Sequence, residues 1–167
     1  ASCGPEDAEG EWMRRRHRTA GAILVTALLC SAFAARECAA APTDDIIARG
    51  KALTIASDCA SCHTADPAKP FAGGKRIDTP FGAVFSPNLT PDHDTGIGGW
   101  SEDDFLRALR MGISPSGAHY YPAFPYPSFT KLIRDDILAI RAYLATLPPV
   151  SNRPPPPQLR WPLNYRV

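Results

Sequence analysis

The 167-residue sequence lacks a charge bias of either sign. Lysine and arginine total 18, aspartate and glutamate total 17, and the formal net charge at pH 7 is +1. Aromatic residues make up only 9% of the chain, and no basic run follows residue 41. A nucleic-acid-binding surface normally needs a basic patch with aromatic side chains among the cations. The sequence therefore predicts no nucleic-acid partner.

Cysteines are also scarce, and most of them lie near the N-terminus. Cys3, Cys30 and Cys38 precede residue 42, so Cys59 and Cys62 are the only thiols in the rest of the chain. One close pair does not make the disulfide framework of a small secreted domain. The sequence also shows no serine–histidine–acid set and no phosphate-binding glycine loop, so a hydrolase has no support.

The first 41 residues have the composition of an export leader. Residues 1–12 precede a natural start at Met13 and fit no export pattern, so we interpret them as a spurious extension. From Met13 a basic segment, MRRRHR, is followed by an apolar segment and by alanine-rich cleavage positions at Ala34 or Ala39–Ala41. This order is typical of a signal peptide, and the apolar stretch is short for a membrane span. We predict a removed signal peptide; the alternative is a retained anchor.

The stretch DCASCHTAD places Cys59 and Cys62 three positions apart, with His63 directly after the second thiol. A structural zinc site needs four ligands, usually from two such pairs, and His93 and His119 do not form a second pair. A redox dithiol expects a preceding strand and a βαβ context. The spacing C-x-x-C-H is the signature of c-type haem attachment, with two thioethers and an axial histidine. We therefore predict one covalent haem c (heme c) on Cys59, Cys62 and His63.

The region 42–150 is expected to form a single domain of short helices and long loops. Apolar residues recur at helical spacing in three segments, and capping residues precede them. The expected helices are 44–57, 102–111 and 135–147. The segments 64–99 and 113–130 are rich in proline and glycine and show no convincing strand pattern, so they are expected to be loops around a large apolar cofactor. Residues 151–167 are expected to form a proline-rich extended tail or linker.

Two residues on different predicted helices are expected to meet. Gly50 lies on the first helix and Tyr143 on the last. A small residue lets two helix backbones approach, and a ring can fill the space beside it. The first and last helices are therefore predicted to cross at this pair.

From Ile46 to about Arg166 the sequence resembles a class I cytochrome c domain. More narrowly, it is similar to the first haem domain of the three-haem cytochrome c subunits of bacterial membrane-bound alcohol, gluconate and aldehyde dehydrogenases. The similarity is carried by ARGKALTIASDCASCHTA, by the loop and helix KPFAGGKRIDTPFGAVFSPNLTPDHDTGIGGWSEDDFLRALRMGI, and by YYPAFPYPSFTKL and IRAYLATLPPV. The resemblance implies a small all-α fold wrapped round one covalent haem.

The resemblance also implies a function. A domain of this kind would be a periplasmic electron carrier and not itself an enzyme, lying in the periplasm or at the periplasmic face of the inner membrane. It would take single electrons from the catalytic subunit of a membrane-bound dehydrogenase and pass them to a downstream acceptor, quinone or a terminal oxidase. Membrane association would come through that partner or through an uncleaved leader.

Two features depart from the family pattern. The sequence contains one C-x-x-C-H, whereas a three-haem subunit continues into two further haem domains, so a one-haem relative and a truncated or split copy are both open. In the loop where many class I cytochromes place a methionine ligand, this sequence has Phe124, which has no lone pair to donate. The candidates for the distal iron ligand are Met111 and His119. The alternative is an open iron site, as in a haem enzyme or a gas or peroxide sensor.

Trp100 is the remaining candidate for contact with the cofactor. Its indole N–H is able to donate a hydrogen bond to a haem propionate. The other interpretation is that its ring is a hydrophobic plug before the Ser101 cap.

Overall fold

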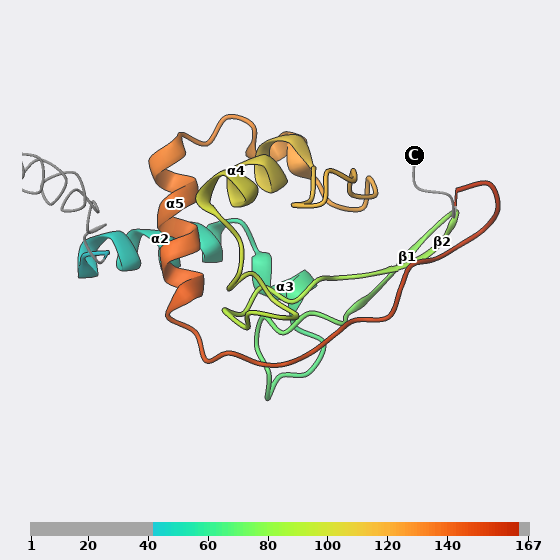
Figure 1. Cartoon of the computed structure of the whole chain (residues 1–167), viewed down its shortest axis with the longest axis horizontal. Coiled ribbons are helices and arrows are strands. Elements are labelled where there is room, and N and C mark those ends of the chain that lie inside the picture. The colour runs from blue at the N-terminus through green and yellow to red at the C-terminus, as the bar shows by residue number, and fades with distance from the viewer. Residues whose placement is uncertain (1–41, 164–167) are drawn as a thin grey trace, which may run out of the picture. The chain divides into compact units, whose positions relative to one another are not determined.

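The computed structural model describes residues 42–163. The predicted leader lies outside the described residues. In chain order the described elements are helices α2 (Asp44–Ala56) and α3 (Cys59–His63), strands β1 (Arg76–Thr79) and β2 (Gly82–Phe85), helix α4 (Glu102–Met111), 3-10 helix η1 (Tyr126–Phe129), helix α5 (Arg134–Ala145) and strand β3 (Gln158–Leu159) (Figure 1). Within residues 42–163, every helix is too short or too polar to cross a lipid bilayer.

The three predicted helices are present, and local signals account for their ends. Helix α4 begins with a reciprocal capping box between Ser101 and Asp104 and ends at Gly112, whose φ of 66° is left-handed. Helices α2 and α5 each carry two aspartates in the first turn, where they stabilise the positive end of the helix dipole. Thr43 is the N-cap residue of α2, but its side chain makes no capping hydrogen bond.

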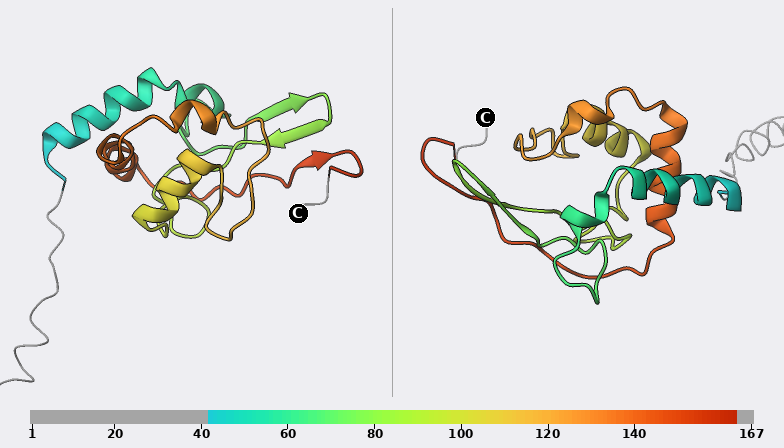
Figure 2. Two further views of the ribbon diagram at one scale, coloured as in Figure 1. Left: turned by 90° about the horizontal axis from the view of Figure 1, so that it is seen from above. Right: turned by 180° about the vertical axis from the view of Figure 1, so that it is seen from behind.

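Helices α2 and α5 cross, as Figures 1 and 2 both show. Gly50 stands at the crossing: a Cβ atom added there would lie 1.9 Å from the carbonyl oxygen of Ala139 and 3.0 Å from Cβ of Tyr143. No side chain larger than hydrogen fits without moving backbone. The predicted meeting of Gly50 and Tyr143 is therefore confirmed.

The buried core joins helices and loops in one cluster. Its buried members are Phe71, Ile97, Phe105, Leu106, Ile137, Ile140 and Leu144. Phe71 and Ile97 come from the long predicted loop, and Phe71 packs edge-on against the ring of Tyr143 with centroids 6.5 Å apart. Cys59 and Trp100 are partly buried against the same cluster. The loop residues thus bring the cysteine–histidine motif next to the core.

A small antiparallel sheet departs from the all-α expectation. Strands β1 and β2 form a hairpin in which Ile77 pairs with Val84 and Thr79 with Gly82, and β3 adds two residues beside β2. Each hairpin strand has four residues, and in β2 two neighbouring residues, Ala83 and Val84, are both buried. Strand prediction relies on strict alternation of apolar and polar residues, and the sequence GAVF of β2 has none, so this hairpin has no clear sequence signal.

The segment after α5, residues 148–159, is extended and follows the surface of the domain to the hairpin (Figure 1). We call this segment the strap. Its first three residues belong to the predicted domain, and residues 151–159 belong to the region expected to be a tail or linker. Hydrogen bonds at Val150 and Asn152 and the pairing of β3 with β2 attach it to the domain.

Candidate functional site

Helix α3 gathers the three residues of the C-x-x-C-H motif. Residues three and four positions apart lie on one side of a helix, so Cys59, Cys62 and His63 share a side of this five-residue element. Asp58 precedes it with a left-handed φ of 51°. The Lys75 ammonium donates a hydrogen bond to the Ser61 carbonyl at 2.6 Å and ties α3 to the start of the hairpin.

His63 is held in one orientation. Its Nδ1 lies 2.8 Å from the carbonyl oxygen of Pro87, and this is the only hydrogen bond of the ring to the residues that the structure describes. Burial lowers the pKa of His63, so the ring is neutral at pH 7. A carbonyl accepts only from a protonated nitrogen, so Nδ1 carries the hydrogen and Nε2 keeps a lone pair for a metal.

The backbone around Pro87 is tightly packed. The amide of Gly73 donates to the carbonyl of His63 at 2.8 Å. Gly73 has a φ of +73°, and a Cβ atom there would lie 2.5 Å from the carbonyl carbon and oxygen of Pro87. Sequence reasoning missed the roles of both residues; the pair Gly73–Gly74 was the available signal, because adjacent glycines often mark close backbone approach.

The two thiols are free in the structure, with Cys59 partly buried and Cys62 exposed. Burial raises the pKa of Cys59 to about 11, and the negative charge of Asp58 acts in the same direction. Redox dithiols depend on a thiol with a lowered pKa, whereas the pKa of Cys59 is raised. In the part of the chain that is described, no three His, Cys, Asp or Glu side chains are grouped to hold a metal ion. The residues therefore fit neither of the two alternatives to haem.

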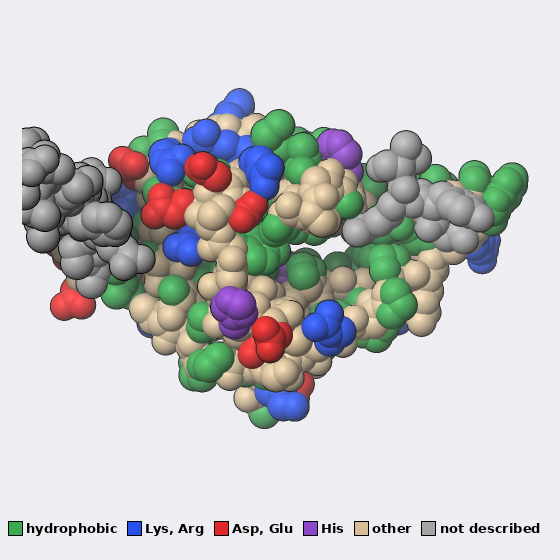
Figure 3. All heavy atoms as spheres, viewed as in Figure 1, with side chains coloured by type: hydrophobic (Ala, Val, Ile, Leu, Met, Phe, Trp, Pro, Cys, Tyr) green, Lys and Arg blue, Asp and Glu red, His purple; other side chains and the backbone are tan. Residues whose placement is uncertain are grey.

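The surroundings of α3 fit a large apolar group. Figure 3 shows a hollow, lined largely by hydrophobic side chains, between the loop that follows α4 and the hairpin β1–β2. Cys59 already packs against the core cluster. Two free thiols, an imidazole with Nε2 unbonded and an apolar surround are the donor set and the environment that a covalent haem requires.

Trp100 is partly buried against the core. Both of its backbone polar groups are hydrogen-bonded. The N–H donates to the Ile97 carbonyl, and the carbonyl accepts from the Arg141 side chain at 2.8 Å. The indole N–H has no hydrogen-bond partner among the described residues. It is therefore available to a propionate.

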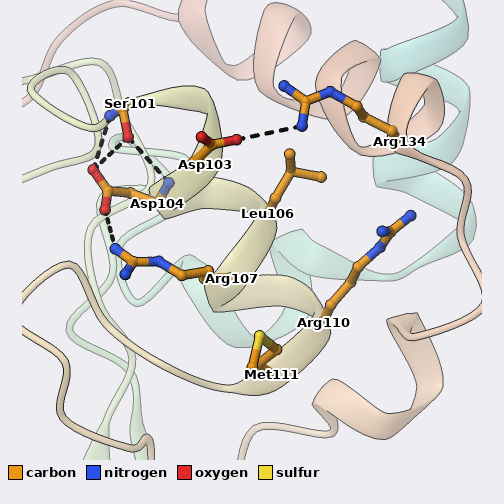
Figure 4. A pocket seen from close by; sticks show the side chains of 8 residues that line it. All are labelled: Ser101, Asp103, Asp104, Leu106, Arg107, Arg110, Met111 and Arg134. Carbon is orange, nitrogen blue, oxygen red and sulfur yellow. Dashed lines mark hydrogen bonds and ion pairs between the residues drawn. The ribbon is translucent and has the colours of Figure 1, made fainter.

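Met111 lies at the end of α4 with 53% of its surface exposed. It lines a surface pocket of about 580 Å³ together with Leu106, Arg107, Arg110 and Arg134 (Figure 4). None of the three residues of the C-x-x-C-H motif lines this pocket. The pocket that Met111 lines is therefore separate from the C-x-x-C-H motif on α3.

His119 is exposed in the loop after α4, where its backbone pairs with Ile113. In the same loop the ring of Phe124 lies edge-on to Tyr120, with centroids 5.9 Å apart, and stacks on Phe129 at 5.7 Å. The loop position at which the family resemblance implies a methionine ligand is thus occupied by an aromatic cluster.

Comparisons with known proteins agree with this geometry. The family model "Cytochrome c" matches residues 47–148. The chain is 49% identical over 121 residues to a subunit of the nicotinate dehydrogenase of Pseudomonas putida and 44% identical over 122 residues to the cytochrome c subunit of alcohol dehydrogenase (quinone) of Gluconobacter oxydans. It is also 44% identical over 124 residues to a diheme cytochrome c-type protein of Cereibacter sphaeroides.

These matches cover 71–72% of this chain but only 10%, 26% and 42% of the three relatives, in the order given. The chain thus spans less than half the length of each of these proteins. The match to the family model covers more than half of the chain and includes the whole C-x-x-C-H motif. The chain therefore belongs to the cytochrome c family.

Proposed function

We propose that this domain is a periplasmic electron carrier with one covalent haem c, serving a dehydrogenase. It takes single electrons from the catalytic subunit and passes them to quinone or a terminal oxidase. The observation that carries the proposal is the arrangement on α3, where two free thiols lie beside a neutral imidazole whose Nδ1 is fixed by Pro87. Relatives that are cytochrome c subunits of dehydrogenases support the same function.

Different residues of the chain would hold different parts of the cofactor. The Cys59 and Cys62 sulfurs would form the thioethers, and Nε2 of His63 would bind the iron. Bound in this way, haem supplies a reversible one-electron change at iron. The Pro87 carbonyl keeps the imidazole from rotating, and the core beside Cys59 keeps water from that side of the site. The Trp100 indole N–H would donate to a propionate.

For the distal side we propose His119 as the iron ligand in preference to Met111. Met111 belongs to a pocket on α4 that none of the haem-motif residues lines. His119 comes from the same loop as Phe124, five residues before it. Two imidazole ligands generally give a lower reduction potential than a histidine–methionine pair.

The leader and the relatives support the proposed location and partner. The periplasm follows from the leader predicted in residues 13–41. The partner class follows from the relatives, which are subunits of dehydrogenases for nicotinate and alcohol. The single haem follows from the single C-x-x-C-H motif, although one relative is a diheme protein.

The proposal is tested with the full chain produced in a host that attaches haem c. An anaerobic redox titration should show a reversible one-electron transition. Membranes of the organism that encodes this protein should reduce the haem when they are given the substrate of the partner dehydrogenase. The substrates to test are nicotinate, primary alcohols, aldehydes and gluconate. Boiled membranes should not reduce the haem. Carbon monoxide binding to the undenatured ferrous protein, together with peroxide turnover, would instead establish the open-iron enzyme or sensor.

A further inference from the structure

A buried polar cluster lies directly after Pro87. Asn88 is 2% exposed and Thr90 is fully buried. The Asn88 Oδ1 accepts from the backbone N–H of Thr90 at 2.9 Å and from its hydroxyl at 2.8 Å. The Asn88 Nδ2 donates to the Val150 carbonyl at 2.7 Å and to the Thr95 hydroxyl at 3.1 Å. Both donors and both lone pairs of the amide are used, which fixes its position.

The strap supplies the other half of this cluster. The backbone N–H of Val150 donates to the Thr90 hydroxyl at 3.1 Å, and the backbone N–H of Asn152 donates to the Thr95 hydroxyl at 3.0 Å. The side chain of Asn152 donates to the carbonyl of Ala72 at 2.8 Å. Val150 and Asn152 lie beyond residue 148, where the match to the family model ends.

These bonds hold Pro87 from two sides. Asn88 is the next residue in the chain, and it is anchored to the strap. Ala72 precedes Gly73, which packs against the Pro87 carbonyl and donates to the carbonyl of His63. Movement of either Asn88 or Ala72 would therefore move the oxygen that receives the hydrogen of His63.

We propose that Asn88 and Asn152 are positioning residues for His63, because with the strap they keep the Pro87 carbonyl within hydrogen-bond distance of Nδ1. The proposal rests on the proposed function, in which Nε2 of the same ring binds iron. A hydrogen bond from Nδ1–H makes an imidazole ligand more basic and fixes its plane. A more basic ligand favours ferric over ferrous iron, so weakening the bond raises the reduction potential.

The test compares three variants of the haem-loaded full chain. Asn88→Ala removes the whole amide, whereas Asn152→Ala removes a single side-chain bond at a partly exposed site. Thr54→Val is the matched control: Thr54 is buried and donates one hydrogen bond to Gly50 within α2, on a different element from Pro87. The readouts are the exchange rate of the His63 Nδ1 hydrogen by NMR, the reduction potential and the midpoint of denaturation.

We expect both asparagine variants to raise the exchange rate of the Nδ1 hydrogen by up to about tenfold, the change that corresponds to losing one hydrogen bond of ordinary strength. We also expect both to raise the reduction potential. The control should lose stability without either change. If Asn88→Ala does not fold, Asn152→Ala alone decides. An unchanged exchange rate and potential in a haem-loaded asparagine variant would overturn this inference and leave the proposed function intact. A wild-type chain that carries no haem would overturn the proposed function and this inference with it.

Discussion

The carbonyl oxygen of Pro87 lies 2.8 Å from Nδ1 of His63, although the two residues are 24 positions apart in the chain. Proline has no N–H, so at this point the backbone offers only an acceptor. Through this contact, the long loop after α3 returns to α3 and fixes the orientation of the His63 imidazole. The same loop contributes Phe71 and Ile97 to the core.

Replacement of Gly73 should disturb this contact. In Gly73→Ala the new methyl group would lie 2.5 Å from the Pro87 carbonyl, in addition to the strain of a positive φ. The strain alone costs about 1–2 kcal/mol, and the overlap should add about 2 kcal/mol. Chemical denaturation of the haem-loaded protein measures the loss.

Gly117→Ala is the matched control for that variant. Gly117 has a φ of +85°, but a Cβ atom there meets nothing within 4 Å. It should therefore show only the cost of the strain. Equal losses of stability in the two variants would show that the close approach of Gly73 to Pro87 contributes nothing.

The crossing of α2 and α5 should not tolerate a side chain at Gly50. A methyl group there overlaps the backbone oxygen of Ala139, which cannot turn aside as a side chain would. We expect Gly50→Ala to lower the free energy of unfolding by about 3 kcal/mol. Ala52→Leu adds more bulk to the same helix at an exposed position and should change it by about 0.5 kcal/mol at most. A tolerated Gly50→Ala would mean that the helices pack differently.

The capping box of α4 should make part of the stability depend on pH. Hydrogen bonds from the Ser101 hydroxyl and backbone N–H, with a smaller contribution from Arg107, lower the pKa of Asp104 below 3.8. Between the lowered pKa and the ordinary one, the unfolded chain binds more protons than the folded chain. This stabilisation is therefore present above the ordinary pKa and is lost as the pH falls through the lowered one.

Asp104→Asn should accordingly be less stable than wild type at pH 7, and the difference should shrink in acid. Asp103→Asn removes the same charge from the same turn, but Asp103 takes no part in the capping box. Denaturation midpoints measured from pH 7 down to pH 2 distinguish the two variants. A gap between wild type and Asp104→Asn that stays constant with pH would contradict the role of the carboxylate.

The distal ligand is open to a direct spectroscopic test. If His119 binds the iron, His119→Ala should give a high-spin ferric spectrum and allow carbon monoxide to bind the ferrous protein. Met111→Leu should leave the low-spin spectrum unchanged, because Met111 is exposed on a separate pocket. A near-infrared sulfur-to-iron band in the wild type that disappears in Met111→Leu would reverse the assignment.

Features with local signals were predictable from the sequence. The Ser101 capping box, the Gly112 stop and the three long helices depend on residues within a few positions of each other. The meeting of Gly50 with Tyr143 followed from size alone. The geometry of the C-x-x-C-H motif was also predictable. Cys62 and His63 lie three and four positions after Cys59, which places all three side chains on one side of a helix.

Features set by the path of the chain were not predictable. The acceptor for His63 is a backbone carbonyl, which every residue possesses, so no side-chain pattern marks Pro87. Asn88 finds its acceptor at Val150, 62 residues away, in a segment whose prolines indicate only an extended chain. Strand β2 lacks alternation because Ala83 and Val84 are both buried.

The most direct test is the mass of the exported protein under denaturing conditions. The account predicts the polypeptide plus one haem, with a Soret band that persists after denaturation. The Cys59→Ala, Cys62→Ala double variant should lose both. A wild-type mass equal to the polypeptide alone, with no Soret band, in cells that load a co-expressed cytochrome c normally, would contradict the account.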